Sequence, residues 1–365
     1  MSRLDDEREL LSKPGDVIIE MLEHLKMSQV ELAQRTGKTA SKVNDLITGK
    51  EPITVQTALQ LEKVLGIDAQ FWLNRETLYR EKLARIEQEE ALEECLDWLK
   101  DQPLPILKKH GYLKTEKVGI QMAEECLKFY GVSSPTQWES VYVDRYVSSD
   151  FRKSSIHHTM LTSLAAWLRI GEIEMQKLKL PEYNKDSFKN ALLEIRNLVR
   201  HQPEDFAERL KRSCLESGVA IVYTINVPKA PVSGVARWMG GNPLIQLTDR
   251  GKTNDKFWFT FFHEAGHILL HGKKEVFIED FELYDADKEK EDQANEFARA
   301  TLLPANIESE LPEKITEKEI RLLARKYDTH PAIVLGQLQK LKKVPYSFGN
   351  SLKLKIVLDY VIAKH

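Results

Sequence analysis

A His-Glu-x-x-His segment at residues 263–267 constrains this chain more than any other feature. It lies within a strongly apolar run that spans residues 257–270. On a helix, residues i and i+4 share a face, so the imidazoles of His263 and His267 can both reach one metal ion. Glu264 points about 100° away around the helix axis, where its carboxylate can hold a water molecule instead of the metal. The spacing therefore predicts a helix that carries a metal site with a base beside it.

The residues around the motif support this interpretation over chance. A shuffled chain of this composition would contain such a motif in about 3 of 100 cases, so the motif alone is moderate support. Two imidazoles and a carboxylate inside an apolar helix are costly to bury without a partner. A zinc ion is such a partner, and it requires one more protein ligand and one open position for water. We therefore expect Zn²⁺ as the cofactor.

The third ligand is expected on the next helical segment, residues 291–304. Glu291 begins the apolar face of that helix, and Asn295 falls within about 40° of it at 100° per residue. Glu291 is therefore the predicted third ligand. Asn295, one turn later, could hydrogen-bond a ligating imidazole and set its tautomer. His271, one turn after the motif, is the alternative ligand, although its position beside a glycine favours a role at the end of the helix.

Composition sets the limits of the remaining inferences. A chain of 365 residues can form two or three domains, and its 42% hydrophobic and 30% charged residues are typical of a globular protein. The net charge of −3 gives no overall attraction to nucleic acid, so any DNA contact has to be local. No segment has the length of a transmembrane helix, and the N-terminus has no apolar leader. We therefore expect no membrane partner, and the cytoplasm is the expected location.

The sequence pattern changes along the chain and divides it into five segments. Three short β-rich runs at 219–223, 234–239 and 244–248 precede the motif and indicate a small antiparallel sheet. The expected fold is mainly α with this small sheet, formed by an α+β zincin-like C-terminal domain and an all-α helix-turn-helix N-terminal domain. The expected segments are an N-terminal arm (1–13), a helix-turn-helix domain (14–80), a helical linker or platform (81–202), a zincin-like domain (203–345) and a C-terminal tail (346–365).

The first of these domains shows clear helix boundaries. Ser28 and Glu31 have the spacing of a capping box at the start of one helix. Gly37 interrupts that helix, and Thr39 can cap the next one. Two short helices separated by a turn with glycine are typical of a helix-turn-helix, in which the second helix, here 39–48, enters the major groove.

A local DNA-binding surface follows from this pattern. The side chains that could reach bases or phosphates are Lys38, Ser41, Lys42, Asn44 and Lys50. Residues 14–80 nevertheless carry eight basic and nine acidic side chains, and Asp45 and Glu51 lie on or beside the same helix. Because DNA affinity depends mainly on phosphate neutralisation, this balance keeps a protein-docking module or a dimerisation bundle open as alternatives.

The N-terminal motifs resemble a known family. Residues 28–33 (SQVELA), 49–54 (GKEPIT) and 71–74 (FWLN) resemble the HigA-type antitoxin branch of the XRE helix-turn-helix proteins, over about residues 14–80. The departures are Asp45 and Glu51, near which family members commonly carry basic residues. The resemblance implies operator DNA as a partner and a homodimer that joins two half-sites.

The C-terminal motifs resemble a second family. Residues 263–271 (HEAGHILLH), 291–298 (EDQANEFA) and 302–304 (LLP) resemble the ImmA/IrrE family of zinc metallopeptidases, over about residues 203–343. The resemblance implies that His263, His267 and Glu291 bind Zn²⁺ and that Glu264 is the general base. It also implies a protein substrate, a repressor or an antitoxin-like protein, in a stress, phage or mobile-element circuit.

Together these patterns predict a zinc-dependent endopeptidase fused to a DNA-binding-type domain. The first alternative is a transcriptional regulator or antitoxin whose metal domain is a sensor that cleaves nothing. The second is a scaffold that binds a toxin partner through its first domain. The side chain that would stabilise the oxyanion is left open among Tyr284, His330 and Arg237.

Overall fold

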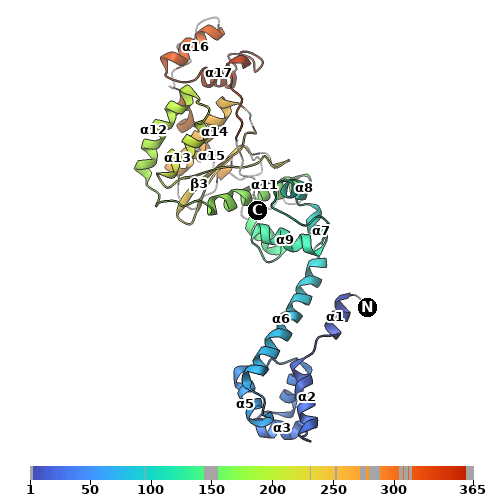
Figure 1. Cartoon of the computed structure of the whole chain (residues 1–365). Helices are drawn as coiled ribbons and strands as arrows, with labels where there is room; N and C mark the ends of the chain where they lie inside the picture. Colours follow the sequence, from blue (N-terminus) through green and yellow to red (C-terminus); the bar gives the residue numbers. More distant parts are fainter. Residues whose placement is uncertain are drawn as a thin grey trace. The chain divides into compact units, whose positions relative to one another are not determined.

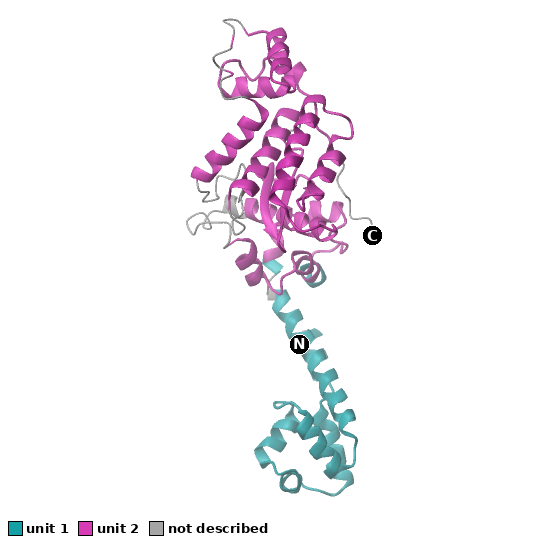
Figure 2. Cartoon of the chain, turned by 90° about the vertical axis from the view of Figure 1, so that its left-hand side faces the viewer, with its two compact units in different colours: residues 1–97, 119–123 teal, residues 98–118, 124–365 magenta. Residues whose placement is uncertain are grey.

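The chain divides into two units, residues 1–97 with 119–123 and residues 98–118 with 124–365 (Figure 2). The structure is a computed structural model that describes residues 3–94, 96–143, 155–230, 232–250, 253–271, 277–278, 288–303, 307, 311 and 315–358. Helices α7 (Leu96–Lys100) and α9 (Ile120–Tyr130) each have residues in both units. The five predicted segments have other boundaries, since residue 97 lies inside the predicted linker (81–202), and they stay a prediction.

Unit 1 consists of helices in the part that the structure describes (Figure 1). They are α1 (Arg3–Glu9), α2 (Pro14–His24), α3 (Gln29–Thr36), α4 (Ala40–Thr48), α5 (Val55–Leu65) and α6 (Ala69–Glu94). Ser28, Thr39 and Thr54 each accept a hydrogen bond from the backbone N–H three residues later, at 3.2 to 3.3 Å. Gly37 and Gly49 end α3 and α4 with φ of 68° and 76°, a conformation that glycine adopts without strain. The helix boundaries predicted for the helix-turn-helix are therefore confirmed.

The core of unit 1 holds these short helices together. Trp72 is completely buried, and its indole N–H donates to the carbonyl of Ile67 at 3.1 Å. The first helix contacts α6 through two ion pairs, Arg3 with Glu89 and Arg8 with Glu90. The buried apolar residues of this cluster are Ile18, Leu22, Leu32, Ala33, Val43, Leu46, Ile47, Ile53, Ala58, Leu61, Leu65 and Trp72.

Unit 2 combines helices with one small sheet. Its helices are α8 (Leu104–Lys109), α10 (Pro135–Tyr142), α11 (Ser155–Gln176), α12 (Lys185–His201), α13 (Phe206–Leu215), α14 (Asn254–Leu270), α15 (Lys288–Leu302), α16 (Glu317–Lys326), α17 (Pro331–Lys340) and the 3₁₀ helix η3 (Asn350–Leu352). Its strands are β1 (Ala220–Tyr223), β2 (Gly234–Met239), β3 (Asn242–Leu247) and β4 (Phe277–Ile278). Across the described residues of the whole chain, no helix is both long and apolar enough to span a membrane. The predicted fold class, mainly α with a small sheet, is confirmed.

The sheet differs from the prediction in one respect, because it is mixed and not purely antiparallel. Its strand order is β1-β3-β2-β4, and β1 pairs with β3 in parallel. Strands β2 and β3 form an antiparallel hairpin through Gly240 and Gly241, which have φ of 57° and 95°. After β1 the chain does not form the neighbouring strand but continues to β2, which lies one strand further away. The hairpin then places β3 in the gap between β1 and β2, where it runs in the same direction as β1.

Both faces of the sheet are covered. Ala220 and Val222 of β1 pack with Met175 of α11 on one face. The alternate residues Ile221 and Tyr223 join the larger core that contains α14 on the other face. Because side chains alternate along a strand, a sheet buried on both faces reads as an apolar run, which explains the sequence of β1.

An aromatic core fixes α14 against the helices before the sheet. The ring of Phe206 in α13 lies 5.5 Å from that of Phe257 and 5.7 Å from that of Trp258. The indole N–H of Trp258 donates to Gln202 Oε1 at 2.6 Å. The same cluster includes residues of α12, from Phe188 onward, which the predicted division assigns to the linker. This packing holds the His-Glu-x-x-His helix in a fixed orientation.

Helix α15 approaches α14 closely at Gly266. A Cβ atom built at this glycine would lie 3.1 Å from Cδ1 of Phe297 and 3.3 Å from Cα of Ala294. The two helices therefore meet at a point where a side chain larger than hydrogen has almost no room.

We expect Gly266→Val to push α15 away from α14 and to lower the stability of unit 2 by about 1–3 kcal/mol, the usual cost of overpacking. The measurement is thermal unfolding of the full chain in a chelator, which removes any contribution from bound metal. Gly119→Val is the control, because a Cβ at Gly119 would meet no atom within 4 Å. Equal melting temperatures for the two variants would contradict the close contact.

Candidate metal centre and nucleic-acid interface

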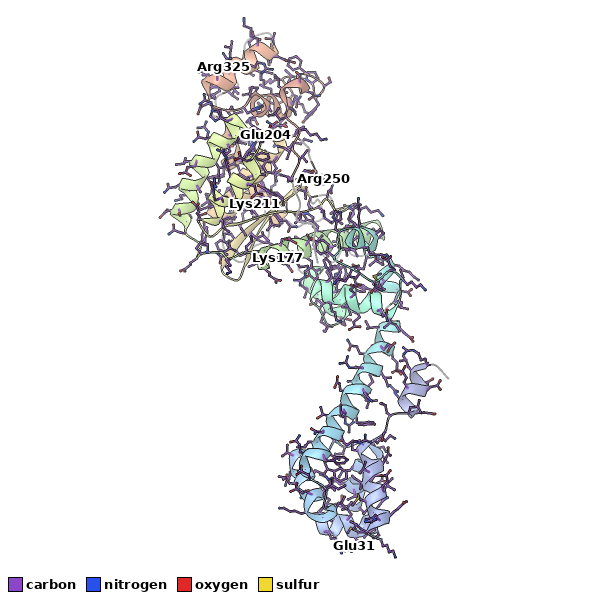
Figure 3. The ribbon with its side chains drawn as sticks, in the orientation of Figure 1. Glu31, Lys177, Glu204, Lys211, Arg250 and Arg325 are labelled. Carbon is purple, nitrogen blue, oxygen red and sulfur yellow. The ribbon has the colours of Figure 1, made fainter. Side chains whose placement is uncertain are left out.

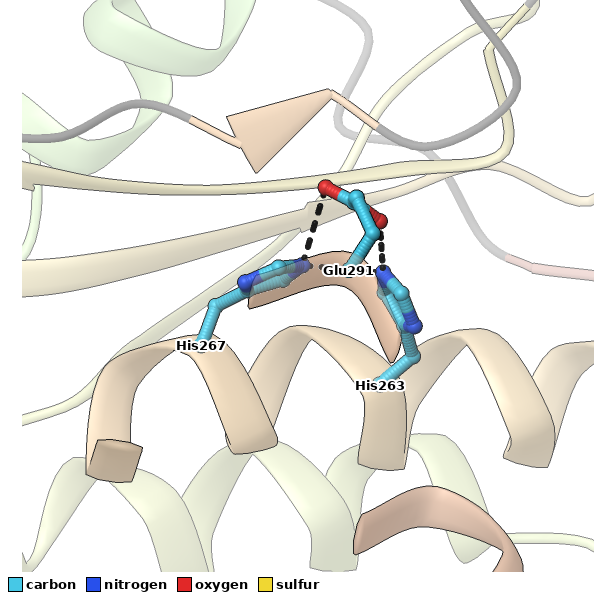
Figure 4. A group of neighbouring side chains, drawn as sticks. All are labelled: His263, His267 and Glu291. Atoms are coloured by element: carbon cyan, nitrogen blue, oxygen red, sulfur yellow. Dashed lines mark hydrogen bonds and ion pairs between the residues drawn. The ribbon is translucent and has the colours of Figure 1, made fainter. Parts of the chain in front are cut away.

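Helices α14 and α15 bring three potential metal ligands together. The Nε2 atoms of His263 and His267 lie 2.9 Å apart. The carboxylate of Glu291, in the first turn of α15, lies 3.2 Å from Nε2 of His263 through Oε2 and 3.4 Å from Nε2 of His267 through Oε1. Figure 4 shows both imidazoles pointing from α14 toward this carboxylate. These three residues, which together form the metal group, are the ones that the sequence predicts as ligands.

The spacing of these donor atoms fits a tetrahedral zinc site. Zinc binds imidazole nitrogen and carboxylate oxygen at about 2.0–2.1 Å, so two ligand atoms in a tetrahedral site lie about 3.3 Å apart. The separations of 2.9, 3.2 and 3.4 Å lie close to that value. The carboxylate side chain is 22% exposed and both imidazoles are buried, which leaves one side of the group accessible.

The ionisation states of the group also suit a metal. Burial lowers the pKa of His267 to about 4, because the charged imidazolium loses its hydration. Burial would raise the pKa of Glu291, but hydrogen bonds with His263 and His267 outweigh it and lower that pKa to about 2. At neutral pH the imidazole of His267 is therefore neutral and the carboxylate is ionised. These are the protonation states in which both side chains bind a cation.

Glu264 lies on the side of α14 that faces the sheet and is completely buried. A Cβ built at Gly234, the first residue of β2, would lie 3.1 Å from Oε1 of Glu264 and 2.5 Å from Cγ2 of Thr260. Only a glycine lets the backbone of β2 come this close to the carboxylate. Gly234 is thus a residue of the site that the sequence analysis did not identify.

Two further contacts shape the group. The ring of Phe259, one turn before His263, stacks on its imidazole at 6.2 Å and an interplanar angle of 30°. The i−4 spacing of an aromatic residue was the signal in the sequence that could have revealed this contact. His271 ends α14, and its Nε2 lies 3.2 Å from the carbonyl oxygen of Lys290. The geometric group of three potential ligands contains Glu291 and not His271, the alternative ligand.

The remaining predicted side chains lie elsewhere or lack the expected contact. Among the described residues, the hydrogen bond found at Asn295 is made by its backbone carbonyl, which accepts from Arg299 at 3.2 Å. Its predicted contact with an imidazole therefore stays a prediction. Tyr284, one candidate for stabilising the oxyanion, lies outside the described residues.

The other two oxyanion candidates have structural roles away from the metal group. Arg237 is 4% exposed and pairs with Glu172 at 3.0 Å, on the face of the sheet that carries α11. His330 caps α17 and its Nδ1 lies 3.2 Å from the side-chain nitrogen of Asn254, at the first residue of α14. Nine residues separate Asn254 from His263, a rise of about 13.5 Å along the helix. Neither side chain is placed to act on a carbonyl at the metal group.

Helix α4 presents the predicted nucleic-acid surface. Its apolar side chains are buried in unit 1, and the opposite face carries Ser41, Lys42 and Asn44, all exposed. Lys50 is also exposed, and Lys38 is half-buried. The Nζ atom of Lys42 lies 3.8 Å from Oε1 of Glu51, so part of its charge is already compensated.

Comparison with known protein families identifies both domains. Residues 216–334 match the family model Peptidase_M78, the IrrE N-terminal-like domain. Residues 18–72 match the helix-turn-helix family model HTH_3. The first match contains all residues of the metal group, and the second contains most of α2 and all of α3 to α5. The chain therefore carries an XRE-type helix-turn-helix domain and an IrrE N-terminal-like domain of the Peptidase_M78 family.

Individual proteins are similar to a part of this chain. The chain is 39% identical over 62 residues to an uncharacterized HTH-type transcriptional regulator of Escherichia coli K12, YddM, covering 17% of this chain and 66% of that protein. It is 36% identical over 72 residues to virulence-associated protein I of Dichelobacter nodosus, covering 20% and 67%. The chain thus spans about two thirds of the length of these relatives.

Two solved structures also match a part of the chain. One is an addiction module antidote protein of the HigA family from Coxiella burnetii, at 33% identity and a TM-score of 0.21. The other is the Pseudomonas aeruginosa antitoxin HigA with the higBA promoter, at 26% identity and a TM-score of 0.22. Each match covers 23% of this chain and 92% of the solved chain.

Proposed function

We propose that this chain, which joins a helix-turn-helix domain to an IrrE N-terminal-like peptidase domain, is a zinc-dependent endopeptidase. The observation that carries the proposal is the convergence of two buried imidazoles and the carboxylate of Glu291 at tetrahedral spacing. Glu264 adds a carboxylate that follows the first histidine on the same helix. This combination of three ligands and a separate base is what hydrolysis of a peptide bond requires.

The side chains have distinct roles in the proposed reaction. His263, His267 and Glu291 would hold the zinc ion, which supplies a Lewis acid for the scissile carbonyl when bound. Glu264 accepts a proton from the attacking water as the water oxygen bonds to the carbonyl carbon. The same carboxyl then donates that proton to the amine nitrogen as the C–N bond breaks. No covalent intermediate with the protein is needed.

The substrate that we propose is a repressor or an antitoxin-like protein. The proposal rests on the joined helix-turn-helix domain and on the resemblance to the ImmA/IrrE family. The rival is a regulator or antitoxin whose metal domain senses a signal without cleaving anything. Glu264 favours the enzyme, because a purely structural or sensory metal site does not need a base next to its ligands.

Zinc content tests the ligand set. We expect purified protein to carry about one zinc ion per chain, and we expect Glu291→Ala to lose most of it, since two imidazoles remain. Glu296→Ala is the matched control, because Glu296 lies in the same helix with a side chain that is 62% exposed. Metal is measured by mass spectrometry after dialysis. If both variants retain equal zinc, Glu291 is not a ligand and His271 becomes the next residue to replace.

Glu264→Gln tests the chemistry without removing the metal. The amide has nearly the shape of the carboxylate, so we expect unchanged zinc content and melting temperature. Because the amide cannot accept the proton, cleavage of a partner protein should fall by about 10²–10⁴-fold. The assay co-expresses the chain with candidate partners, namely repressor-like or antitoxin-like proteins from neighbouring genes. Wild-type protein that leaves all of them intact would favour the sensor over the enzyme.

We further propose that the exposed face of α4 binds operator DNA as part of a homodimer. Ser41, Lys42 and Asn44 occupy the positions from which a recognition helix contacts bases and phosphates. Glu51 opposes this role through its contact with Lys42, and Asp45 lies on the same helix. The binding is therefore expected to be weak and sensitive to salt.

Reversing both acidic side chains should strengthen this binding. Asp45→Arg with Glu51→Arg adds positive charge beside Lys42 and is expected to increase affinity in gel shifts with the DNA upstream of the gene, most clearly at low salt. Glu20→Arg with Glu23→Arg changes the net charge equally on the exposed side of α2 and is the control. The absence of any shift at low salt, both for the wild-type chain and for Asp45→Arg with Glu51→Arg, would make the domain a protein-docking module.

A further inference from the structure

A cavity of about 710 Å³ lies in unit 2 beside the metal group. The described residues that line it come from α14, from α15 and the residue after it, from α17, from the segments just before β2 and before α14, and from the segment around η3. Its volume falls in the range of cavities that accept a ligand of several residues or a small molecule. None of the three potential metal ligands lines it, so it is distinct from the metal group.

The cavity begins one helical turn from His263. Phe259 and Thr260 line it, and they precede His263 by four and three residues on the same side of α14. The ring of Phe259 stacks on the imidazole of His263 on one side, and Nζ of Lys340 lies 4.9 Å from the centroid of this ring. The cavity therefore lies along α14, about one helical turn before the metal group.

Its length matches a few residues of an extended peptide. Lys256, which also lines the cavity, precedes His263 by seven residues, or about 10.5 Å along the helix axis. An extended chain rises about 3.3 Å per residue. Side chains one to three residues away from a bond held at the metal group would therefore reach the cavity.

The charged lining of the cavity is predominantly basic among the described residues. Arg250, Lys256, Arg299 and Lys340 contribute four cations, and Arg250 is labelled in Figure 3. The acidic residue of the lining, Asp255, is compensated by Lys353, whose Nζ lies 2.7 Å from Oδ2 of Asp255. Both members of that pair are about 90% buried, so its charges are mutually cancelled inside the wall. Arg299 lies 3.9 Å from Glu296, whose side chain is 62% exposed.

We propose that this basic cavity, defined by Arg250, Lys256, Arg299 and Lys340, binds acidic side chains of the protein substrate next to the scissile bond. The proposal rests on the peptidase function proposed above and adds a substrate class to it. Four cations around one cavity attract aspartate or glutamate side chains and repel basic ones, which gives selectivity through charge complementarity. The position of the cavity, one helical turn from the metal group along α14, favours part of the bound peptide over a separate small anion.

Binding of model peptides tests the proposal independently of cleavage. The probes are three fluorescein-labelled peptides with one common centre, flanked on both sides by three Glu, three Gln or three Lys residues. Fluorescence anisotropy with the zinc-loaded Glu264→Gln full chain is expected to show binding of the Glu peptide about tenfold tighter than that of the Gln peptide. The Lys peptide should bind weakest, and the differences should shrink as salt screens the charges.

Charge reversal in the cavity provides the matched comparison. Lys256→Glu with Lys340→Glu, in the same Glu264→Gln background, replaces two exposed side chains and is expected to weaken binding of the Glu peptide about tenfold and to strengthen binding of the Lys peptide. Lys185→Glu with Lys189→Glu makes the same change of net charge on the exposed face of α12 and should leave the order of the peptides unchanged. Melting temperatures verify that both variants fold.

The outcomes separate this proposal from the peptidase function. Equal affinities for the three peptides, or an equal response of the two double variants, would overturn the basic cavity as a site for acidic side chains. Cleavage of all three peptides at equal rates by the wild-type chain would preserve the peptidase function and overturn the cavity. Charge-dependent binding that responds to Lys256 and Lys340, without cleavage of any substrate, would support the cavity and contradict the peptidase function.

Discussion

The burial of polar side chains in an apolar helix is the constraint on which unit 2 depends. His263, Glu264 and His267 all belong to α14 and are at most 2% exposed. Such groups lose their hydration, so they need a compensating partner inside the protein. The carboxylate of Glu291 compensates the two imidazoles in this structure, at distances that also suit a shared metal ion. The helices and the sheet around α14 keep this arrangement in place.

Close backbone approaches determine where each group lies. Gly266 lets α15 come near enough for Glu291 to reach both imidazoles, and Gly234 lets β2 pass next to Glu264. The aromatic core on the remaining side of α14 prevents the helix from turning away from these contacts. The two imidazoles and the carboxylate of Glu264 therefore lie on different faces of α14. Helix α15 packs against the face that carries the imidazoles, and the sheet packs against the face that carries Glu264. The same helix continues into the wall of the basic cavity.

Charge has a different role in the two units. On α4 of unit 1, the basic side chains that a DNA-binding helix needs are offset by acidic neighbours, and Lys42 is already paired with Glu51. In the basic cavity of unit 2, the one acidic residue of the described lining is paired with Lys353 within the wall, and the lining also contains Arg250, Lys256, Arg299 and Lys340. The whole chain has a net charge of −3, but the lining of this cavity, one helical turn from the metal group, is mainly basic.

The sequence by itself determined the local features of this protein. Helix periodicity placed His263 and His267 on one face, and capping residues marked the boundaries of α3 and α4, because both effects act within a few residues of the chain. Only the tertiary structure decided which distant residues meet. The parallel pairing of β1 with β3, the orientation of Arg237 away from the metal group and the gathering of Lys256, Arg299 and Lys340 around one cavity all depend on how loops return the chain. Those contacts join residues that lie far apart in the sequence. The periodicity of a sequence reflects only neighbours within a few residues, so it cannot predict them.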